Sequence, residues 1–392
     1  MTKSLRLKEK KLLAFLHAVD GVGQRRLAWF LDLRKKSKQS LLKIWLKPKV
    51  KQQILSSKNT FESYKKLKKE HTIDSYWNSL EIKGIVPLFI YDKEYPFLLE
   101  QTATPPVLLY LKYSQAKARK LLSALIPVAV VGSRRITSYG RYVTKKLTTE
   151  LAIAGATIVS GFMYGVDIQA HLAAIEVGGG TIAVLGFGFD TMFPSSHQEE
   201  FYKLLQAGAL FISQFPPHVG AAPGNFPARN AVVAGLSLGV LVTEAGIKSG
   251  SHITAQLALD EGRAVMAVPG PIDNPYSQGT KWLINEGAIL VTSAQDVFLA
   301  LDVKQANISD KLLGQPTKVR PAAFNFSDPL EAKVYQLLLD QDLTTDEILK
   351  KLLLEFDLQA SNLTRLAQVL TSLELAGLIE RVGVSWQGVR RL

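Results

Sequence analysis

Apolar and polar positions follow two different periods along the chain. Over residues 1–80 the apolar positions recur at helical spacing, as at Leu12, Leu16 and Val19. Between about 127 and 303, short continuous apolar runs alternate with amphipathic segments. Buried strands that alternate with helices predict an α/β fold, with a Rossmann-like, doubly wound, mostly parallel sheet covered on both faces.

The segments that flank this sheet have their own patterns. Prolines and short apolar strands over 84–113 are typical of a connector packed on the following domain. Residues 304–327 are polar, contain prolines and show no period, which predicts a linker. Three helical patterns and a short hairpin follow, in the order of a winged helix. The predicted organisation is a helical domain at 1–80, an extended Rossmann-like domain at 81–303, the linker, and a winged-helix domain at 328–392.

A glycine-rich break separates the first two helical patterns. Gly21-Val22-Gly23 is followed directly by Gln24, Arg25 and Arg26. The arrangement resembles a helix-hairpin-helix, in which glycines let backbone N–H groups approach a phosphate of DNA. A simple turn between helices, which needs glycine only for its backbone angles, is the alternative. The lysine runs at 35–38 and 65–69 fit solvated helix faces.

Charge is distributed unevenly along the 392 residues. The formal net charge is +13, which favours a polyanionic partner. Residues 1–120 carry 26 basic and 10 acidic side chains, whereas residues 121–310 carry 11 and 14. The basic excess is therefore N-terminal, and it forms either a DNA-binding face or a solvated one.

Composition excludes several classes of protein. The chain has no cysteine, which rules out disulfide scaffolds and thiolate sites. Its longest uncharged apolar run, 121–131, contains Pro127 and falls well short of the roughly 20 residues that span a bilayer. The first residues lack the pattern of a secretory signal. We therefore expect a cytoplasmic protein with no membrane contact.

Four loops have the composition of an anion site at the carboxyl ends of the predicted strands, where open α/β sheets bind ligands. Glycines permit close backbone approach, hydroxyls and N–H groups donate to oxyanions, and cations pair with phosphates. One aromatic side chain offers a surface on which a base can stack. The candidate DNA-binding residues are Gly132, Ser133 and Arg134; Gly161; Phe226, Arg229 and Asn230; and Lys248, Ser249 and Gly250.

Each of these residues also has a purely structural interpretation. The glycines can serve tight turns alone, and Phe226 can fill a core position. Asp167 can cap its helix or bond His171, and Ser251 is the expected N-cap of the helix after Lys248. The convergence of four loops on one edge favours the binding interpretation.

Enzymatic motifs are absent. Gly186-Phe187-Gly188 has Thr191 where a dinucleotide site needs a third small residue. No G-x-x-x-x-G-K-[ST] phosphate loop occurs, and the six histidines form no H-x-x-x-H pair. We predict no catalytic residue, no metal site and no cofactor.

The ordered motifs over roughly 80–300 resemble the DNA-processing protein A family, also called DprA or Smf. The motifs that carry the resemblance are Val128–Arg134, Ser160-Gly161, Gly165-Val166-Asp167, Ala170-His171, Phe226-Pro227-x-Arg229-Asn230, Glu244-Ala245, Lys248-Ser249-Gly250-Ser251, Thr254-Ala255, Val268-Pro269-Gly270, Gly279-Thr280, Leu283-Ile284 and Gly287-Ala288. Members often carry an N-terminal domain of sterile-alpha-motif or helix-hairpin-helix type and a C-terminal winged helix.

The resemblance implies a role without catalysis. Such proteins bind single-stranded DNA that enters the cell during natural transformation (competence), protect it, and help load the RecA recombinase. They act as homodimers through the Rossmann domain. By position, Arg134 and Lys248 would contact phosphates and Phe226 would line a base pocket, with Arg229 and Asn230 shaping that pocket or contacting the strand.

Three positions depart from the family pattern. Ala231 stands where an arginine is usual, which removes one phosphate contact. Met163, beside Phe162 and Tyr164, replaces a small residue and predicts a bulkier rim. Gln214 stands where acidic residues are frequent, which favours a polyanion.

Two other functions stay open. A nucleotide-processing enzyme of phosphoribohydrolase type would share the phosphate loops, but Gly178-Gly179-Gly180-Thr181 lacks the expected signature order. A double-stranded-DNA regulator would act through the winged helix. Its candidate contacts are Asn362, Arg365, Arg381, Arg390 and Arg391.

Overall fold

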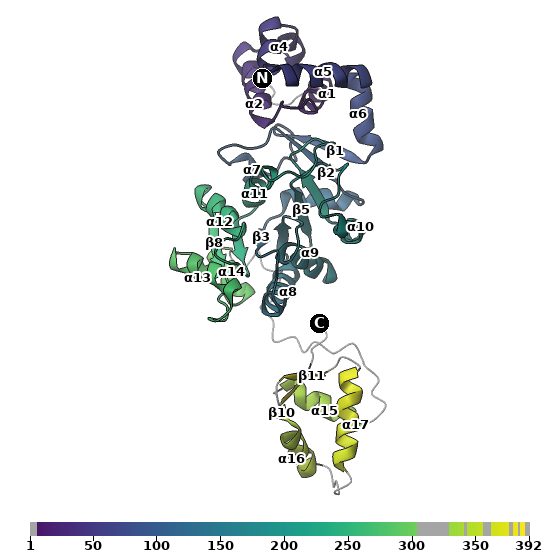
Figure 1. Cartoon of the computed structure of the whole chain (residues 1–392), viewed down its shortest axis with the longest axis vertical. Helices are drawn as coiled ribbons and strands as arrows, with labels where there is room; N and C mark the ends of the chain where they lie inside the picture. Colours follow the sequence, from purple (N-terminus) through teal and green to yellow (C-terminus); the bar gives the residue numbers. More distant parts are fainter. Residues whose placement is uncertain are drawn as a thin grey trace. The chain divides into compact units, whose positions relative to one another are not determined.

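The computed structural model describes residues 6–303, 329–340, 343–355, 362–375, 379–382 and 385–388. Two compact units, Met1–Leu313 and Gly314–Leu392, are described separately (Figure 1). The predicted linker at 304–327 and the candidate contacts Arg390 and Arg391 lie outside the described residues.

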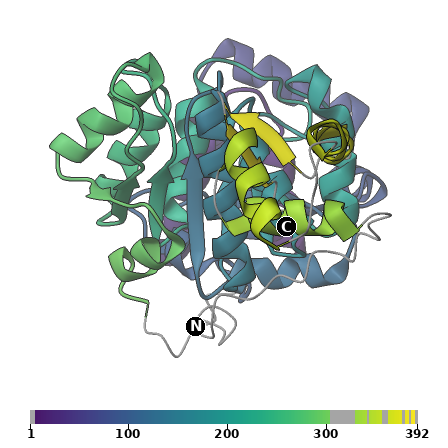
Figure 2. The same cartoon turned by 90° about the horizontal axis from the view of Figure 1, so that it is seen from below.

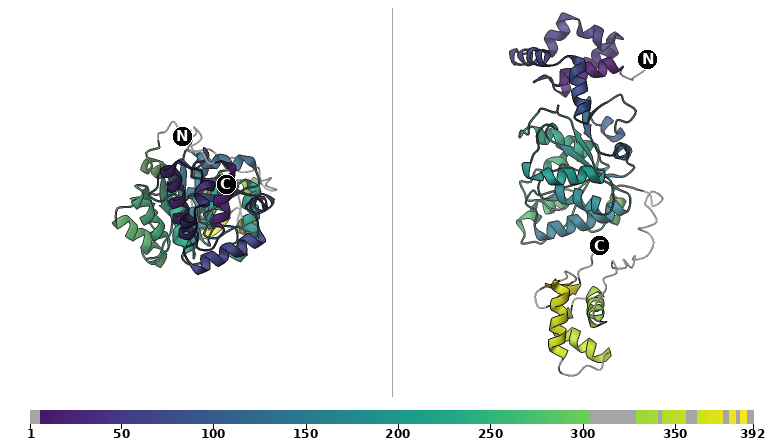
Figure 3. Two further views of the ribbon diagram at one scale, coloured as in Figure 1. Left: turned by 90° about the horizontal axis from the view of Figure 1, so that it is seen from above. Right: turned by 90° about the vertical axis from the view of Figure 1, so that its right-hand side faces the viewer.

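The first unit begins with a bundle of six helices, purple and dark blue in Figures 1 and 3. They are α1 (Leu7–His17), α2 (Gln24–Ser37), α3 (Leu41–Trp45), α4 (Pro48–Ile54), α5 (Lys58–Glu70) and α6 (Ile73–Ile82). Their apolar positions are buried in one core, which includes Leu12, Leu16, Leu27 and Phe30. The helical spacing seen in the sequence is therefore the inward face of this bundle.

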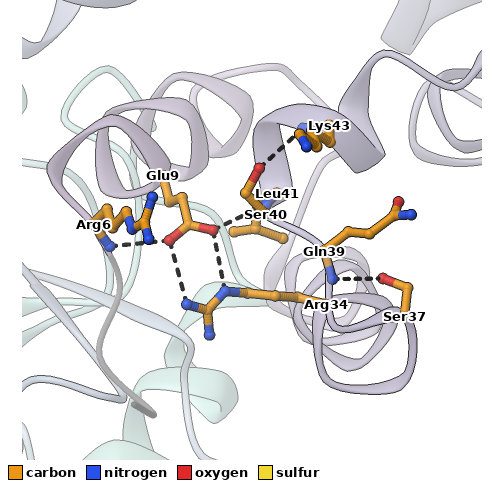
Figure 4. A network of polar contacts seen from close by, with 8 residues as sticks. All are labelled: Arg6, Glu9, Arg34, Ser37, Gln39, Ser40, Leu41 and Lys43. Carbon is orange, nitrogen blue, oxygen red and sulfur yellow. Dashed lines mark hydrogen bonds and ion pairs between the residues drawn. The ribbon is translucent and has the colours of Figure 1, made fainter. Parts of the chain in front are cut away.

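A buried carboxylate ties the start of the bundle together. Glu9 is 1% exposed and accepts hydrogen bonds from the N–H groups of Arg6 (3.0 Å) and Leu41 (2.9 Å) and from Nε of Arg34 (3.1 Å) (Figure 4). Burial raises the pKa of Glu9, but these donors together outweigh burial and leave its pKa below the usual value. The ionised carboxylate thus joins α1 to α2 and α3.

Nine strands form the sheet of the first unit. They are β1 (Ile85–Phe89), β2 (Leu108–Lys112), β3 (Pro127–Val131), β4 (Thr157–Ser160), β5 (Thr181–Leu185), β6 (Leu210–Ser213), β7 (Gly239–Val242), β8 (Ala264–Ala267) and β9 (Ile289–Leu290). Their order is β1-β2-β6-β5-β4-β3-β7-β8-β9, parallel from β6 to β9. The chain leaves β3 in one direction and returns to its other side as β7. The strand order therefore reverses between β3 and β7.

Helices cover both faces of this sheet, which confirms the predicted doubly wound fold. The helices are α7 (Phe97–Glu100), α8 (Ser138–Ile153), α9 (Val166–Glu176), α10 (Gln198–Ala207), α11 (Asn225–Gly235), α12 (Ser251–Asp260), α13 (Gln278–Asn285) and α14 (Ala294–Ala300), with short 3-10 turns at Ala116–Ser123, Ser195–His197 and Pro275–Ser277. One core joins the sheet to α11 and α12, and another joins it to α8, α9 and α14. The green helices α12 to α14 lie toward the β9 edge (Figure 2).

The segment 84–113 is more than the predicted connector. Its two strands pair with each other in antiparallel fashion, and β2 pairs with β6 in the same way, so the two strands extend the sheet. Leu109 and Leu111 face the sheet's own core, whereas Leu108 and Tyr110 face the helical bundle. Both sides of β2 are buried because the strand lies between two layers, and its continuous apolar run follows from that position.

The second unit has its own core. It contains α15 (Pro329–Asp340), β10 (Leu343–Thr344), α16 (Thr345–Glu355), α17 (Asn362–Leu375), β11 (Ile379–Val382) and β12 (Ser385–Gly388). The strands form a three-stranded sheet in the order β10-β12-β11, and Val334, Ile348 and Leu370 are among the buried core residues. Its identification as a winged helix stays a prediction.

Candidate nucleic-acid interface

An open cavity of about 770 Å³ lies where the strand order reverses. The loops after β3, β4 and β7 and the first turns of α11 and α12 surround it; we call it the four-loop cavity. The structure brings all ten predicted site residues to its lining: Gly132, Ser133, Arg134, Gly161, Phe226, Arg229, Asn230, Lys248, Ser249 and Gly250. A reversal of strand order is where open α/β sheets form ligand crevices.

The loop after β3 presents two arginines, Arg134 and Arg135, to solvent. The Ser133 hydroxyl donates to the carbonyl of Arg135 (2.9 Å) and accepts from its N–H (3.0 Å), so it stabilises the turn. The Arg134 side chain is exposed, and its guanidinium carbon lies 5.4 Å from the centre of the Phe226 ring. The cation and the aromatic ring therefore lie side by side at the cavity.

Glu244 holds the loop after β3 in place through hydrogen bonds. The residue is 2% exposed, and its carboxylate accepts from the N–H of Thr137 (2.9 Å) and from the Thr137 hydroxyl. Its own carbonyl accepts from the N–H of Ser133 (2.8 Å). Both ends of the segment that carries Arg134 are thus bonded to one residue at the end of β7. No local sequence pattern indicates this role of Glu244, because the partners are more than 100 positions apart.

The loop after β4 packs directly on the loop after β3. The N–H of Val166 donates to the carbonyl of Ser133 (3.1 Å). Gly165 has a φ of +78°, and a Cβ at this position would lie 2.1 Å from the same carbonyl oxygen. Only glycine fits both the backbone angle and the close approach.

Arg229 lies under the cavity. It is 3% exposed and donates to the carbonyls of Val184 (2.8 Å) and Gly161. Burial lowers its pKa to about 10 against the opposing effect of Asp167, whose own pKa is raised by burial and partly restored by Arg229. At neutral pH Arg229 is therefore charged and shapes the floor, which leaves Arg134, Arg135 and Lys248 as the exposed cations of this lining.

The predicted bulky rim is wrong for Phe162. This residue has a φ of +57° and is completely buried against His171 and other aromatic rings. Met163 lines the four-loop cavity although it is only 3% exposed, and Tyr164 reaches the surface. The suggested bond between Asp167 and His171 does not form either, because Nδ1 of His171 lies 2.7 Å from the Thr181 hydroxyl. The loop turns inward at Phe162 because the ring buries more apolar surface in the aromatic core than it would at the rim.

Two helices begin at the four-loop cavity. The N-caps of α11 and α12 are Gly224 and Gly250, which have no side chain to cap the helices. The expectation that Ser251 caps α12 is therefore wrong: the helix begins at Ser251, whose N–H donates to the Ser249 hydroxyl (3.3 Å). The next two N–H groups of α12 donate to the carbonyls of Ser249 and Gly250 (both 3.2 Å). The positive ends of the two helix dipoles nevertheless favour anions.

The charges at this lining are cationic on balance. Its one carboxylate, Asp167, is 8% exposed and faces Arg229. Arg134 and Lys248 form no ion pair among the described residues. The described ranges hold no group of three acidic or histidine side chains arranged to bind a metal ion. Within the same ranges, no helix is both long and apolar enough to cross a bilayer.

The four-loop cavity lies within the part of the chain that a family model matches. The family model described as DNA recombination-mediator protein A matches residues 87–302, more than half of the chain. The chain belongs to this family. Protein Smf of Escherichia coli is 48% identical over 170 residues, which cover 43% of this chain and 46% of that protein. DNA processing protein DprA of Bacillus subtilis is 37% identical over 228 residues, 58% of this chain and 75% of that protein.

A solved relative has the same architecture. The X-ray structure of DNA processing protein A from Streptococcus pneumoniae matches with a TM-score of 0.63 and 32% identity, over 75% of this chain and 98% of that one. The match to the E. coli relative spans less than half of that protein's length. The family resemblance seen in the sequence is thereby confirmed for the Rossmann-like region.

Proposed function

We propose that this recombination-mediator family member binds single-stranded DNA in the four-loop cavity. One observation carries the proposal: three exposed cations, the N-termini of two helices and a half-buried aromatic ring line a single open cavity. Phosphates suit the cations and the N–H groups. A base can stack on the Phe226 ring, which requires an unpaired strand.

The finer biological role follows from the same proposal. The protein would protect incoming single strands and help load the RecA recombinase during natural transformation, acting by binding and without catalysis, in the cytoplasm. It would work as a homodimer through the Rossmann-like domain. Exposed apolar side chains toward the β9 edge support such an interface: Ile272 is 91% exposed and Trp282 is 46% exposed.

The test is the affinity for a labelled oligothymidylate, measured by fluorescence anisotropy at several salt concentrations. We expect Arg134→Ala and Lys248→Ala each to weaken binding by about 1–2 kcal/mol, because each removes a charge-assisted contact to phosphate. Lys203→Ala is the matched control, since this exposed cation on α10 is absent from the cavity lining. If both cavity variants bind the oligonucleotide as tightly as Lys203→Ala and the wild type do, the assignment is overturned. Release of free base from nucleoside monophosphates would favour the phosphoribohydrolase alternative instead.

A further inference from the structure

A second cavity, of about 580 Å³, lies on the other side of α11. The hairpin between α1 and α2 forms one wall, and α11 forms another; we call it the hairpin cavity. Its lining includes Gly21, Gly23, Gln24, Arg25, Arg26 and Gln214. This is the glycine-rich segment for which the sequence left phosphate binding open beside a simple turn between helices.

One side chain locks the hairpin onto the sheet. Nε2 of Gln24 donates to the carbonyls of Leu108 (2.9 Å) and Gln214 (3.0 Å). Oε1 of Gln24 accepts from the N–H groups of Val107 (2.9 Å) and Leu108 (3.3 Å). The start of α2 is therefore held at the carboxyl end of β6, the same edge of the sheet that carries the four-loop cavity. A simple turn between helices would need no such attachment.

The first turn of α2 offers unused donors. Its N-cap is Gly23, no side chain caps it, and its first turn holds no acidic residue. The N–H groups of Gln24 and Arg25 have no acceptor among the described residues, and α2 is 14 residues long. The Arg26 side chain already has a partner, because it donates a hydrogen bond to the carbonyl of Ile54 (2.9 Å). The Arg25 side chain is exposed and forms no ion pair within the described ranges.

A buried side chain of the same cavity also lacks a partner. Gln214 is 8% exposed, lines the hairpin cavity, and has no hydrogen-bond partner at Nε2. Leaving a buried amide nitrogen unpaired is costly, so such a group marks a place where a ligand acceptor fits. The one carboxylate of the lining, Glu261, already accepts from the N–H of Ala103 (3.2 Å).

The two cavities face opposite sides of one helix. With 3.6 residues per turn, the α11 positions in the two linings are centred about half a turn apart. The four-loop cavity takes Phe226, Arg229, Asn230 and Val233, and the hairpin cavity takes Ala228, Ala231 and Val232. A helix with its side chains is about 10 Å wide. A strand that crosses the exposed start of α11 can therefore reach both cavities.

We propose that Gly23, Gln24 and Arg25 hold a backbone phosphate of the same single strand that enters the four-loop cavity. This second contact rests on the proposed function for its ligand. It makes the α1–α2 hairpin part of the DNA-binding surface. Among the many basic residues of 1–120, it assigns a DNA contact to Arg25.

Two variants of the full-length chain test the second contact. Arg25→Ala removes the cation. Gly23→Asp adds a carboxylate that can cap α2 itself, because the Gly23 backbone is extended (φ −89°, ψ −178°) and a Cβ there meets nothing within 4 Å. Lys203→Ala again is the control, with the same change in charge. We expect Gly23→Asp to unfold at the wild-type temperature or higher.

Oligonucleotide length separates the two sites. With oligothymidylates of about 4–5 nucleotides, the lower end of known site sizes, both variants should bind like the wild type. With about 16–20 nucleotides, we expect each to bind at least fivefold more weakly, with the slope of log affinity against log salt reduced by about 0.7. Wild-type affinity for the long strand in both variants would overturn the second contact. If Arg25→Ala weakens binding while Arg134→Ala does not, the four-loop assignment fails and the hairpin contact stands.

Discussion

Arg134 and Arg229 show how surroundings decide what a guanidinium group does. Arg134 is exposed beside the Phe226 ring, whereas Arg229 is 3% exposed and bonded to the carbonyls of Gly161 and Val184. A charge in water is available to a ligand. A buried one is held by the partners that compensate for its lost hydration. An arginine therefore offers a ligand contact at position 134, whereas at position 229 it supports the floor of the cavity.

This difference predicts opposite effects on stability. Arg229→Ala should lower the free energy of unfolding by about 3–5 kcal/mol, because it leaves Asp167 buried without its partner. Arg134→Ala should change it by about 0.5 kcal/mol or less, as for most surface substitutions. Chemical denaturation of both variants measures the contrast. Similar stability of the two would show that Arg229 is not a structural residue.

At the scale of elements, the shape of the cavity depends on hydrogen bonds and close packing between its loops. Glu244 at the end of β7 bonds Thr137 at the start of α8 and also holds Ser133, so the Arg134 loop is fixed at both ends. The close approach at Gly165 joins the next loop to it. A loop held in this way loses little entropy when it binds a phosphate.

A double-mutant cycle tests whether Glu244 positions Arg134. Glu244→Gln keeps the shape but cannot accept from both donors of Thr137, so we expect single-stranded DNA to bind more weakly. In the Arg134→Ala background the loss should shrink, because the positioned cation is gone. Anisotropy titrations of the four proteins give the coupling. Strictly additive losses would mean that Glu244 acts on affinity by another route.

Sequence periodicity and loop composition were enough to predict the sheet and the ten residues at the cavity, because apolar runs mark buried strands and their carboxyl ends converge. They could not predict the inward turn at Phe162, which depends on a positive φ and on aromatic partners from α10 and β6. Nor could they pair Asp167 with Arg229, 62 positions away. Contacts between distant segments leave no local pattern.

At the scale of the molecule, the basic helical bundle and the sheet share a core. Phe89, Leu108 and Tyr110 are completely buried between them, and His17 stacks on Tyr110 with 5.7 Å between ring centres. The predicted boundary at residue 80 stays a prediction, but the core continues across it. The helical bundle that carries the N-terminal basic charge therefore also completes a core that stabilises the sheet.

Removal of residues 1–82 should accordingly damage the remainder. Each large apolar side chain that becomes exposed loses about 1.5–3 kcal/mol of burial, and an apolar face of β1 and β2 meets solvent. We expect the shortened chain to aggregate or to unfold at a clearly lower temperature. Size-exclusion chromatography and thermal unfolding measure this. A well-dispersed product with the wild-type unfolding temperature would show that the shared core is dispensable.

The most direct test of the central claim is the affinity of the Arg134→Ala, Lys248→Ala double variant for single-stranded DNA at moderate salt, with duplex DNA of the same length as competitor. We predict that the wild type prefers the single strand and that the double variant loses about 2–4 kcal/mol of binding free energy, since the two cations contact different phosphates. Undiminished single-strand affinity in the double variant, or a wild-type preference for the duplex, would contradict it.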